Sequence, residues 1–319
     1  MNNISGNERI FWATGKFSPD SAEEKISRGK GRYLPLFRET VDLMHKVNKD
    51  LRHRCLTFAI KAGTECALRR EGEKVERCTV RERVHSVFQE LKLKFIIVVM
   101  RVLFDLTKKN PKNEECDPKQ RPILFIHGFG AHSSCWAYMR KAMKERGFRN
   151  IFFVNLQSSL VSSIAQHAER VERVAAKIRE VTGRHDLDIV AHSMGGVVGR
   201  HFLYNGSGKS TVHTFVSLGS PLGGANKAKL GAPVIKVARS MVPGSKLLHN
   251  HTQSASQDKH TRYFHLAAEN DITVRPWTSA LEGGAQIFSS AILRSGGHVG
   301  MLFSKEVADW IAESLSPQV

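Results

Sequence analysis

The sequence predicts an α/β fold, with a mostly parallel central sheet of about six strands flanked by helices and an N-terminal helical extension. Beyond residue 122, short apolar runs alternate with segments whose apolar residues recur every three to four positions. Strands that alternate with helices form a parallel sheet covered on both faces. With 319 residues, of which 41% are hydrophobic, the chain is long enough to bury a sizeable core.

Each expected strand is a short apolar run. The runs span residues 123–126, 151–154, 187–190, 212–218, 263–267 and 286–293. Among the helices, 164–181 has the clearest ends, because Ser163 and Gln166 form a capping box before it and Gly183 follows it. A final amphipathic helix is expected over residues 305–315.

Composition divides the chain into four regions. Residues 1–33, rich in Ser, Gly, Lys and Asn, predict a poorly ordered basic arm. Residues 34–107 predict a helical region, and residues 108–121, dense in charge and proline, predict a linker. The α/β domain that would carry a catalytic site is expected over residues 122–319.

The helical region contains a long amphipathic helix, which begins at the capping box of Thr79 and Glu82. Its apolar face is expected to consist of Val84, Val87, Phe88, Leu91, Phe95, Val98, Val102 and Leu106. Lysines and Arg101 lie along or beside this face. Two roles fit the pattern: the helix lies on an anionic membrane, or it packs on the α/β domain as an extra layer.

The formal net charge of +18 indicates anionic partners. The excess is spread along the chain, with 25 basic against 17 acidic residues up to position 120 and 23 against 13 beyond it. A basic surface of this kind suits an anionic membrane. Because the sequence has no zinc-finger spacing and no RNA-binding aromatic signature, we expect no nucleic-acid partner.

The cysteines and the apolar runs bear on location. Five cysteines without a C-x-x-C pair indicate reduced thiols. Residues 1–16 contain no apolar leader, and the longest apolar run, 95–106, is interrupted by Arg101 and Asp105. That run is shorter than the roughly 20 apolar residues of a membrane span. We therefore expect a cytoplasmic protein, with peripheral attachment to a membrane as an extension of that reading.

The segment from Asp188 to Gly196 carries the clearest chemical signal. A buried apolar strand leads into Ser193, and Gly195-Gly196 and a helical run follow at once. This is the strand–turn–helix context of a nucleophile elbow, with Ala191 where glycine is usual. The alternative is an accidental glycine turn after a strand, since five-residue serine motifs are common by chance.

A second element upstream favours the elbow. The strand 123–126 ends in His127-Gly128-Phe129-Gly130. In a fold with a nucleophile elbow, the loop after this strand supplies one oxyanion-binding N–H, and the residue after the nucleophile supplies the other. We assign the two donors to the backbone amides of Phe129 and Met194.

Serine needs a base to remove its proton and an acid to orient that base. Asp271 follows the strand 263–267, and His298 lies in a glycine-rich loop before the last helix, so both fit the chain order serine, acid, histidine. Glu269 is the rival acid, but it is expected within or beside the strand. Among the 15 histidines, His127 and His192 are motif neighbours, which we expect to be structural.

The segment from Pro122 to Leu315 resembles lipases and esterases of the α/β-hydrolase superfamily. Four stretches are similar to small bacterial triacylglycerol lipases: 191–196 to the elbow, 218–224 to the loop after the next strand, 241–245 to the cap region, and 297–302 to the segment around the catalytic histidine. The resemblance implies the α/β-hydrolase fold and serine-dependent hydrolysis of carboxylic, lipid-like esters through an acyl-enzyme. It implies no cofactor and no metal.

The resemblance leaves several points open. Many members of the family are secreted, and the N-terminal helical region has no recognised counterpart. An acyltransferase with the same triad, or a non-catalytic protein that binds membranes or a partner, remains an alternative. Residues 233–248 suit either an apolar lid or an ordinary surface helix. Residues 206–210 resemble part of a phosphate loop, but Leu203 stands where that loop requires glycine.

Overall fold

A computed structural model describes the sheet, its helices and a small part of the N-terminal region. The described residues are 54, 68–70, 88, 90, 92–95, 97, 116–156, 161–275, 277–280, 287–294 and 296–316. The predicted arm over 1–33, the capping box at Thr79 and most of the linker over 108–121 lie outside them. In the described part, no helix is both long and apolar enough to cross a bilayer.

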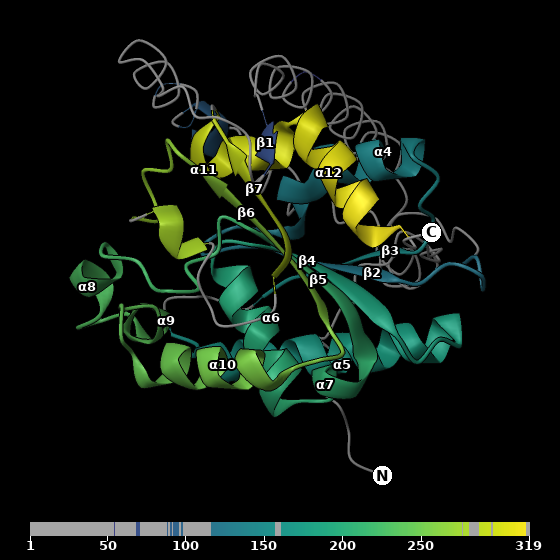
Figure 1. The fold of residues 1–319 in the computed structure, drawn as a ribbon, viewed down its shortest axis with the longest axis horizontal. Coiled ribbons are helices and arrows are strands. Elements are labelled where there is room, and N and C mark those ends of the chain that lie inside the picture. The colour runs from purple at the N-terminus through teal and green to yellow at the C-terminus, as the bar shows by residue number, and fades with distance from the viewer. Residues whose placement is uncertain are drawn as a thin grey trace, which may run out of the picture.

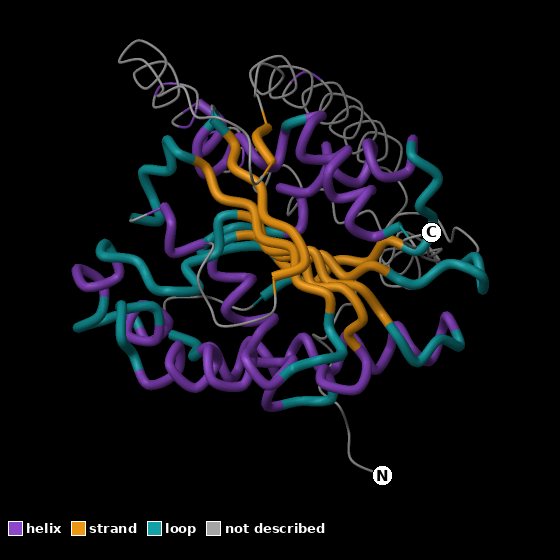
Figure 2. The backbone as a smooth tube through the Cα atoms, in the orientation of Figure 1, coloured by secondary structure: helices purple, strands orange, loops and turns teal. Residues whose placement is uncertain are grey.

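The described residues form one twisted sheet between two layers of helices (Figure 2). Its strands are β1 (Leu68–Arg70), β2 (Ile123–Ile126), β3 (Ile151–Val154), β4 (Leu187–His192), β5 (Val212–Leu218), β6 (Arg262–Ala268) and β7 (Ile287–Leu293). The order is β1-β7-β6-β5-β4-β2-β3, and β2 to β7 pair in parallel. The predicted parallel sheet of about six strands is therefore confirmed.

Strand β1 was not predicted. It pairs antiparallel with β7, with Leu68 opposite Leu293 and Arg70 opposite Ala291. Its Leu-Arg-Arg sequence is too short to show a period of two, and it lies in a region where the sequence predicts helices. The strand forms because β7 offers unpaired backbone groups at the edge of the sheet, which a neighbouring extended segment satisfies.

Helices cover both faces of the sheet (Figure 1). One face has α4 (Ala137–Glu145) and α12 (Lys305–Leu315), and the other has α5 (Ile164–Thr182), α6 (Met194–Asn205) and α10 (Lys246–Gln257). The shorter elements are η1 (Ser133–Trp136), α7 (Gly208–Thr211), α8 (Ala228–Gly231), α9 (Lys236–Ser240), η2 (Trp277–Ala280), α11 (Gly297–Gly300) and η3 (Met301–Phe303). The predicted capping box of α5 is present, and Gly183 ends this helix in the left-handed conformation.

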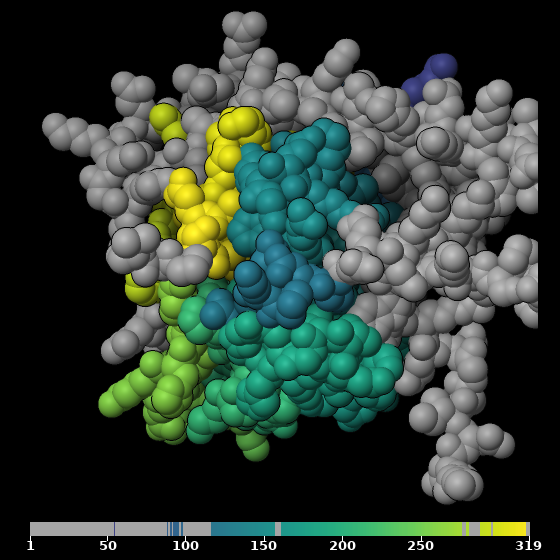
Figure 3. Space-filling view, turned by 90° about the vertical axis from the view of Figure 1, so that its right-hand side faces the viewer, coloured from purple at the N-terminus to yellow at the C-terminus, as the bar shows by residue number. Residues whose placement is uncertain are grey.

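Alternation along each buried strand divides the core in two. Ile123 and Phe125 of β2 pack toward α4 and α12, while Leu124 and Ile126 pack toward α5 and α6. The ring of Phe125 meets Trp136 edge-on, with centroids 5.0 Å apart. On the surface, α12 (yellow) lies beside the teal residues of α4 (Figure 3), where Arg146 Nε donates to Asp309 Oδ1 at 2.9 Å.

The described part of the N-terminal helix packs on the sheet with a different face from the predicted one. Leu93 is fully buried in the core next to α4 and α12, and Ile97 packs against the same cluster. Phe88 and Phe95, which the sequence places on the apolar face, are 60% and 70% exposed. The helix thus has apolar residues on two sides, and the described residues that pack in the core, Leu93 and Ile97, are not those of the predicted apolar face. Whether that face meets a membrane stays a prediction.

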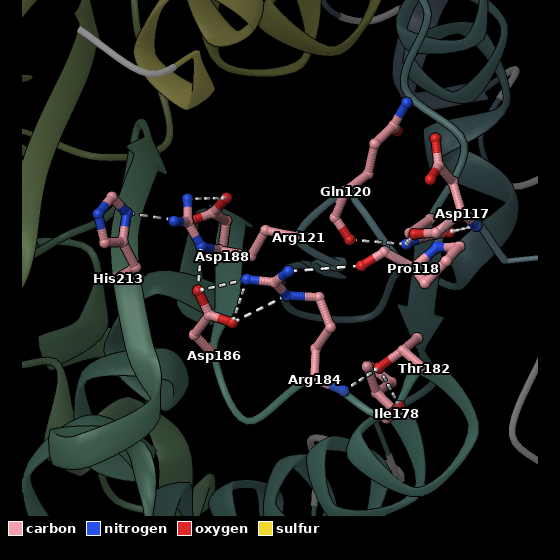
Figure 4. Close-up of polar contacts among 11 residues, drawn as sticks. Asp117, Pro118, Gln120, Arg121, Ile178, Thr182, Arg184, Asp186, Asp188 and His213 are labelled. Atoms are coloured by element: carbon pink, nitrogen blue, oxygen red, sulfur yellow. Dashed lines mark hydrogen bonds and ion pairs between the residues drawn. The ribbon is translucent and has the colours of Figure 1, made fainter.

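A polar cluster joins the amino ends of β2, β4 and β5 (Figure 4). Arg121 Nε donates to Asp186 Oδ2 at 2.7 Å, Arg184 Nε donates to Asp186 Oδ1 at 3.0 Å, and Arg121 also reaches Asp188. Burial would raise the pKa of Asp186, but hydrogen bonds from Arg184 and Arg121 outweigh it and lower the pKa to about 2. These ionic contacts lie at the end of the sheet opposite to Ser193.

Candidate active site

Ser193 lies in a strained turn between β4 and α6. Its φ of 55° and ψ of −129° make it the one non-glycine residue with positive φ in the described part of the chain. Such a conformation costs on the order of 1–3 kcal/mol, and strain of this kind clusters at functional sites. The Ser193 N–H donates to the Leu218 carbonyl at 2.9 Å. The turn therefore presents the hydroxyl beyond the carboxyl end of β4.

Close packing explains the small residues of the predicted elbow. A Cβ on Gly195 would overlap the carbonyl of Ile126, and a Cβ on Gly128 would lie 2.8 Å from the Ser193 Cβ. Ala191, which stands where glycine is usual, is fully buried between β2 and β5. The loop after β2 and the turn after β4 thus lie against each other, as the oxyanion assignment requires.

Asp271 and His298 form a buried hydrogen-bonded pair. His298 Nδ1 and Asp271 Oδ2 are 2.6 Å apart, although the residues are 27 positions apart in sequence. The other carboxylate oxygen accepts the N–H groups of Thr273 at 2.7 Å and Val274 at 2.8 Å. Burial would raise the pKa of Asp271, but the charge and hydrogen bond of His298 and these two amides hold the pKa below its ordinary value.

Glu269 lies elsewhere. Its backbone N–H continues the β6–β7 ladder to the Leu293 carbonyl at 3.0 Å, and its side chain is half-buried. Of the two candidate acids, the structure pairs Asp271 with His298.

His192 connects the turn of Ser193 with the loop of His298. His192 Nε2 lies 2.9 Å from the His298 carbonyl oxygen, so this nitrogen carries a proton and donates it. The two rings are 4.6 Å apart between centroids. Burial, with the positive charge that His298 can carry, lowers the pKa of His192 to about 3. A neutral His192 thus holds the backbone of His298 next to Ser193.

Ser193 and His298 are neighbours without a direct bond. In the described part of the chain, no hydrogen bond joins Ser193 Oγ to the His298 ring. Their common contacts are His192 and the carboxyl end of β5, where Leu218 accepts from Ser193 and a Cβ on the following Gly219 would lie 3.3 Å from His298 Nδ1. Contacts between a catalytic hydroxyl and imidazole often shorten only in the substrate complex.

Two backbone amides belong to the segments that pack together at Ser193. Met194 is the first residue of α6, and Phe129 follows Gly128 in the loop that packs on Ser193. Within the described residues, neither of these N–H groups donates a hydrogen bond to the protein. Free N–H groups at a helix N-terminus favour negative charge. Nearby, His127 bonds the Gly128 carbonyl and the Leu156 amide, which stiffens the loop.

The segment between β5 and β6 packs beside the Asp271 loop. Gly223 N–H donates to the Ser279 carbonyl, and Asn226 N–H donates to the Arg275 carbonyl, both within about 3 Å. Leu230 and Val234, at the outer end of this segment, are 85% and 79% exposed. The expected lid region 233–248 is not one helix, because α9 and α10 are separated by the turn around Gly244.

Two further findings concern ligands. In the part of the chain that is described, no three His, Cys, Asp or Glu side chains gather as metal ligands would. A surface groove of about 490 Å³ between α5 and α6 is lined by residues such as Glu172 and His201. It lies at the end of α6 far from Ser193, so it is separate from the candidate site.

Sequence reasoning missed one residue of the site. Glu90, from the N-terminal helix, is fully buried, and its Oε2 accepts the backbone N–H of His298 at 3.2 Å. The only signal in the sequence was a charged residue within an amphipathic helix, where surface exposure is the usual outcome.

Comparison with known proteins agrees with this architecture. Residues 120–276 match the model of the lipase (class 2) family, a span that includes Ser193 and Asp271. The mature lipase BlEst2 of Bacillus licheniformis superimposes with a TM-score of 0.50 at 19% identity, covering 64% of this chain and 95% of that one. Lipase B of Aspergillus fumigatus superimposes with a TM-score of 0.51 at 14% identity, covering 62% and 53%.

The structural matches define the class: this is an α/β-hydrolase fold. The match to the lipase (class 2) family model confirms the resemblance to lipases and esterases that the sequence predicts. This match supports a carboxylic ester hydrolase in general.

Proposed function

We propose that the protein hydrolyses carboxylic esters through an acyl-enzyme formed on Ser193. The observation that carries the proposal is the buried Asp271–His298 pair at the edge of the sheet where the strained turn presents Ser193. A strained nucleophile turn has no structural purpose of its own, and a buried carboxylate–imidazole pair is the arrangement that orients a general base.

The proposed first step transfers the acyl group to the enzyme. Ser193 Oγ attacks the ester carbonyl while His298 Nε2 takes its proton, and the C–O bond to the alcohol then breaks. The alcohol leaves with the proton that His298 returns. Asp271 accepts the Nδ1–H of His298 and stabilises the imidazolium, a task that its lowered pKa suits because the carboxylate stays ionised.

The tetrahedral intermediate carries a negative oxygen, for which we propose the amides of Phe129 and Met194 as donors. Their free N–H groups and the N-terminus of α6 support this assignment. In the second step, water gives its proton to His298 and attacks the acyl carbonyl. The acid is released, and Ser193 regains its proton.

For the substrate, we propose a lipid-like ester at an anionic surface. The support is the exposed Leu230 and Val234 on the segment whose start packs beside the Asp271 loop, the neighbouring Lys227 and Lys229, and the net charge of +18. Apolar tips insert among acyl chains while lysines remain at the head groups. The match to a lipase family points the same way.

The test combines a covalent probe with a substrate panel. The purified protein should be labelled by a fluorophosphonate, and Ser193→Ala should abolish both labelling and ester hydrolysis while leaving the circular dichroism spectrum unchanged. The panel runs from p-nitrophenyl acetate to palmitate and includes phospholipids, with longer chains expected to be preferred. Activity of Ser193→Ala within tenfold of the parent would remove Ser193 from the proposal.

A further inference from the structure

Glu90 joins the N-terminal helix to the loop of His298. Its carboxylate is completely buried, and Oε2 accepts the His298 N–H at 3.2 Å across 208 positions of sequence. The same oxygen lies so close to Gly297 that a Cβ there would overlap it. Gly297 also has a φ of +61°, so glycine suits this position on both grounds.

The other oxygen of Glu90 reaches the loop of Asp271. Oε1 accepts the Thr273 hydroxyl at 3.1 Å and pairs with Lys94 Nζ at 2.7 Å. Lys94 Nζ in turn donates to the Thr273 hydroxyl at 3.1 Å, and the Thr273 N–H donates to Asp271 Oδ1. One carboxylate thus bonds both loops that carry the proposed acid–base pair.

Burying the Glu90 carboxylate costs free energy, so packing alone does not explain why a glutamate stands here. A buried carboxylate loses its hydration, and its hydrogen bonds and ion pair only offset that loss. Leu93, one helical turn away and just as buried, shows that an apolar side chain fits the same interface. What an apolar residue could not do is accept hydrogen bonds from two loops at once.

We propose that Glu90 is a positioning residue, which sets the geometry of the His298–Asp271 pair and makes the N-terminal helix a working part of the active site. The inference rests on the proposed function of Ser193, Asp271 and His298. Glu90 contacts the backbone N–H of His298 and not its ring. A change at Glu90 should therefore alter turnover rather than substrate affinity.

The experiment uses the full-length chain with Glu90→Gln, Glu90→Asp and Glu90→Ala. Glutamine can accept at one position only and presents an N–H₂ to the other donor, so kcat should fall about tenfold; Ala should cost about a hundredfold, because a misplacement of about 1 Å has that effect. KM should stay within about twofold of the parent. Aspartate keeps the charge but is one methylene shorter, so it should behave like Gln.

A matched control exists in Glu172. It also accepts a backbone N–H and a hydroxyl, both from Ser207, and it also pairs with a cation, Arg179. Glu172 belongs to α5 and bonds Ser207 just beyond the end of α6 that is far from Ser193, so Glu172→Gln should leave kcat and KM within about twofold. If Glu172→Gln lowered kcat as much as Glu90→Gln, the effect would be general destabilisation and the inference would be overturned.

A second variant and a second readout keep the test decisive if Glu90→Ala does not fold. Thr273→Val should lower kcat by a smaller factor, and combined with Glu90→Gln it should add less than its separate effect, because both break the same link. The proton NMR signal of the hydrogen-bonded His298 Nδ1–H should shift or broaden in Glu90→Gln. An unchanged signal with parental kcat in folded Glu90 variants would overturn the inference.

The failure of the proposed function would look different. A parent protein that neither reacts with the fluorophosphonate nor cleaves any ester would remove both proposals together. A parent that does both, with Glu90 variants equal to it, would remove the role of Glu90 alone.

Discussion

The environment of each carboxylate decides its role at the residue scale. Asp271 and Glu269 are two positions apart, yet only Asp271 turns toward His298 and receives two backbone N–H groups. Glu269 remains part of the sheet through its amide. The end of the strand pairing explains the contrast. Glu269 still makes a backbone hydrogen bond between β6 and β7, whereas Asp271 lies in the turn beyond it.

Asp271→Asn should therefore lower turnover by about 10⁴-fold, because the neutral amide neither fixes the His298 tautomer nor stabilises its positive charge. Glu269→Gln, the neighbouring control, should stay within a few-fold of the parent. The measurement is kcat on a soluble p-nitrophenyl ester at neutral pH. A larger loss in Glu269→Gln than in Asp271→Asn would mean that the acid was assigned to the wrong residue.

At the scale of elements, the N-terminal helix shows what an amphipathic pattern leaves undecided. Apolar residues occur on two sides of it, so periodicity alone does not say which side meets the sheet. In the described part of the helix, Leu93 and Ile97 pack in the core, and Glu90 is buried as well. A rule that assigns the most apolar side of a helix to the core does not predict a buried charge such as Glu90. The hydrogen-bond partners of Glu90 come from loops about 200 residues away in sequence.

The packing of this helix can be tested by a pair of truncations. Leu93→Ala should lower the free energy of unfolding by about 2–5 kcal/mol, because it leaves a cavity in the core beneath α4 and α12. Phe95→Ala should change it by about 0.5 kcal/mol or less, since the ring is largely exposed. Urea unfolding of both variants measures these changes, and the reverse order would mean that the side of the helix with Phe95 is the one that packs in the core.

On the scale of the whole molecule, a group of buried histidines couples folding to pH. Burial is the main cause that lowers their pKa values in the folded protein, to about 4 for His167 and about 3 for His192, His251 and His265. The unfolded chain takes up protons near the ordinary histidine value of about 6.5, while the folded chain does not. Their contribution to stability is therefore complete above about pH 6.5 and is lost as the pH falls to about 4 for His167 and to about 3 for the other three.

The free energy of unfolding should consequently fall on acidification between about pH 6.5 and 4, by up to about 1.4 kcal/mol per pH unit for each of these histidines. Urea titrations at half-unit steps measure the slope. His167→Phe should make the curve shallower, because His167 is fully buried and, among the described residues, neither ring nitrogen has a hydrogen-bond partner. Equal slopes in the parent and this variant would contradict the assignment.

The sequence alone determined the parallel sheet, the ends of α5 and the serine turn. Each depends on local chemistry: apolar runs of strand length, a capping box with a following glycine, and small residues where strand and helix must touch. The roles of Ser193, Asp271 and His298 could be predicted for the same reason, since chain order and the ends of strands place them at one edge. Those roles stay predictions until the variants are measured.

Tertiary structure alone decided the rest. The pairing of β1 with β7 depends on an unpaired sheet edge, and the burial of Glu90 depends on donors in two distant loops. The choice of His192 as the link to His298 likewise depends on a carbonyl 106 positions away. These are contacts between segments far apart in sequence, whose partners no local pattern names. The type of a residue determines which hydrogen bonds and contacts it can make, and the folded chain determines which partners lie close enough to make them.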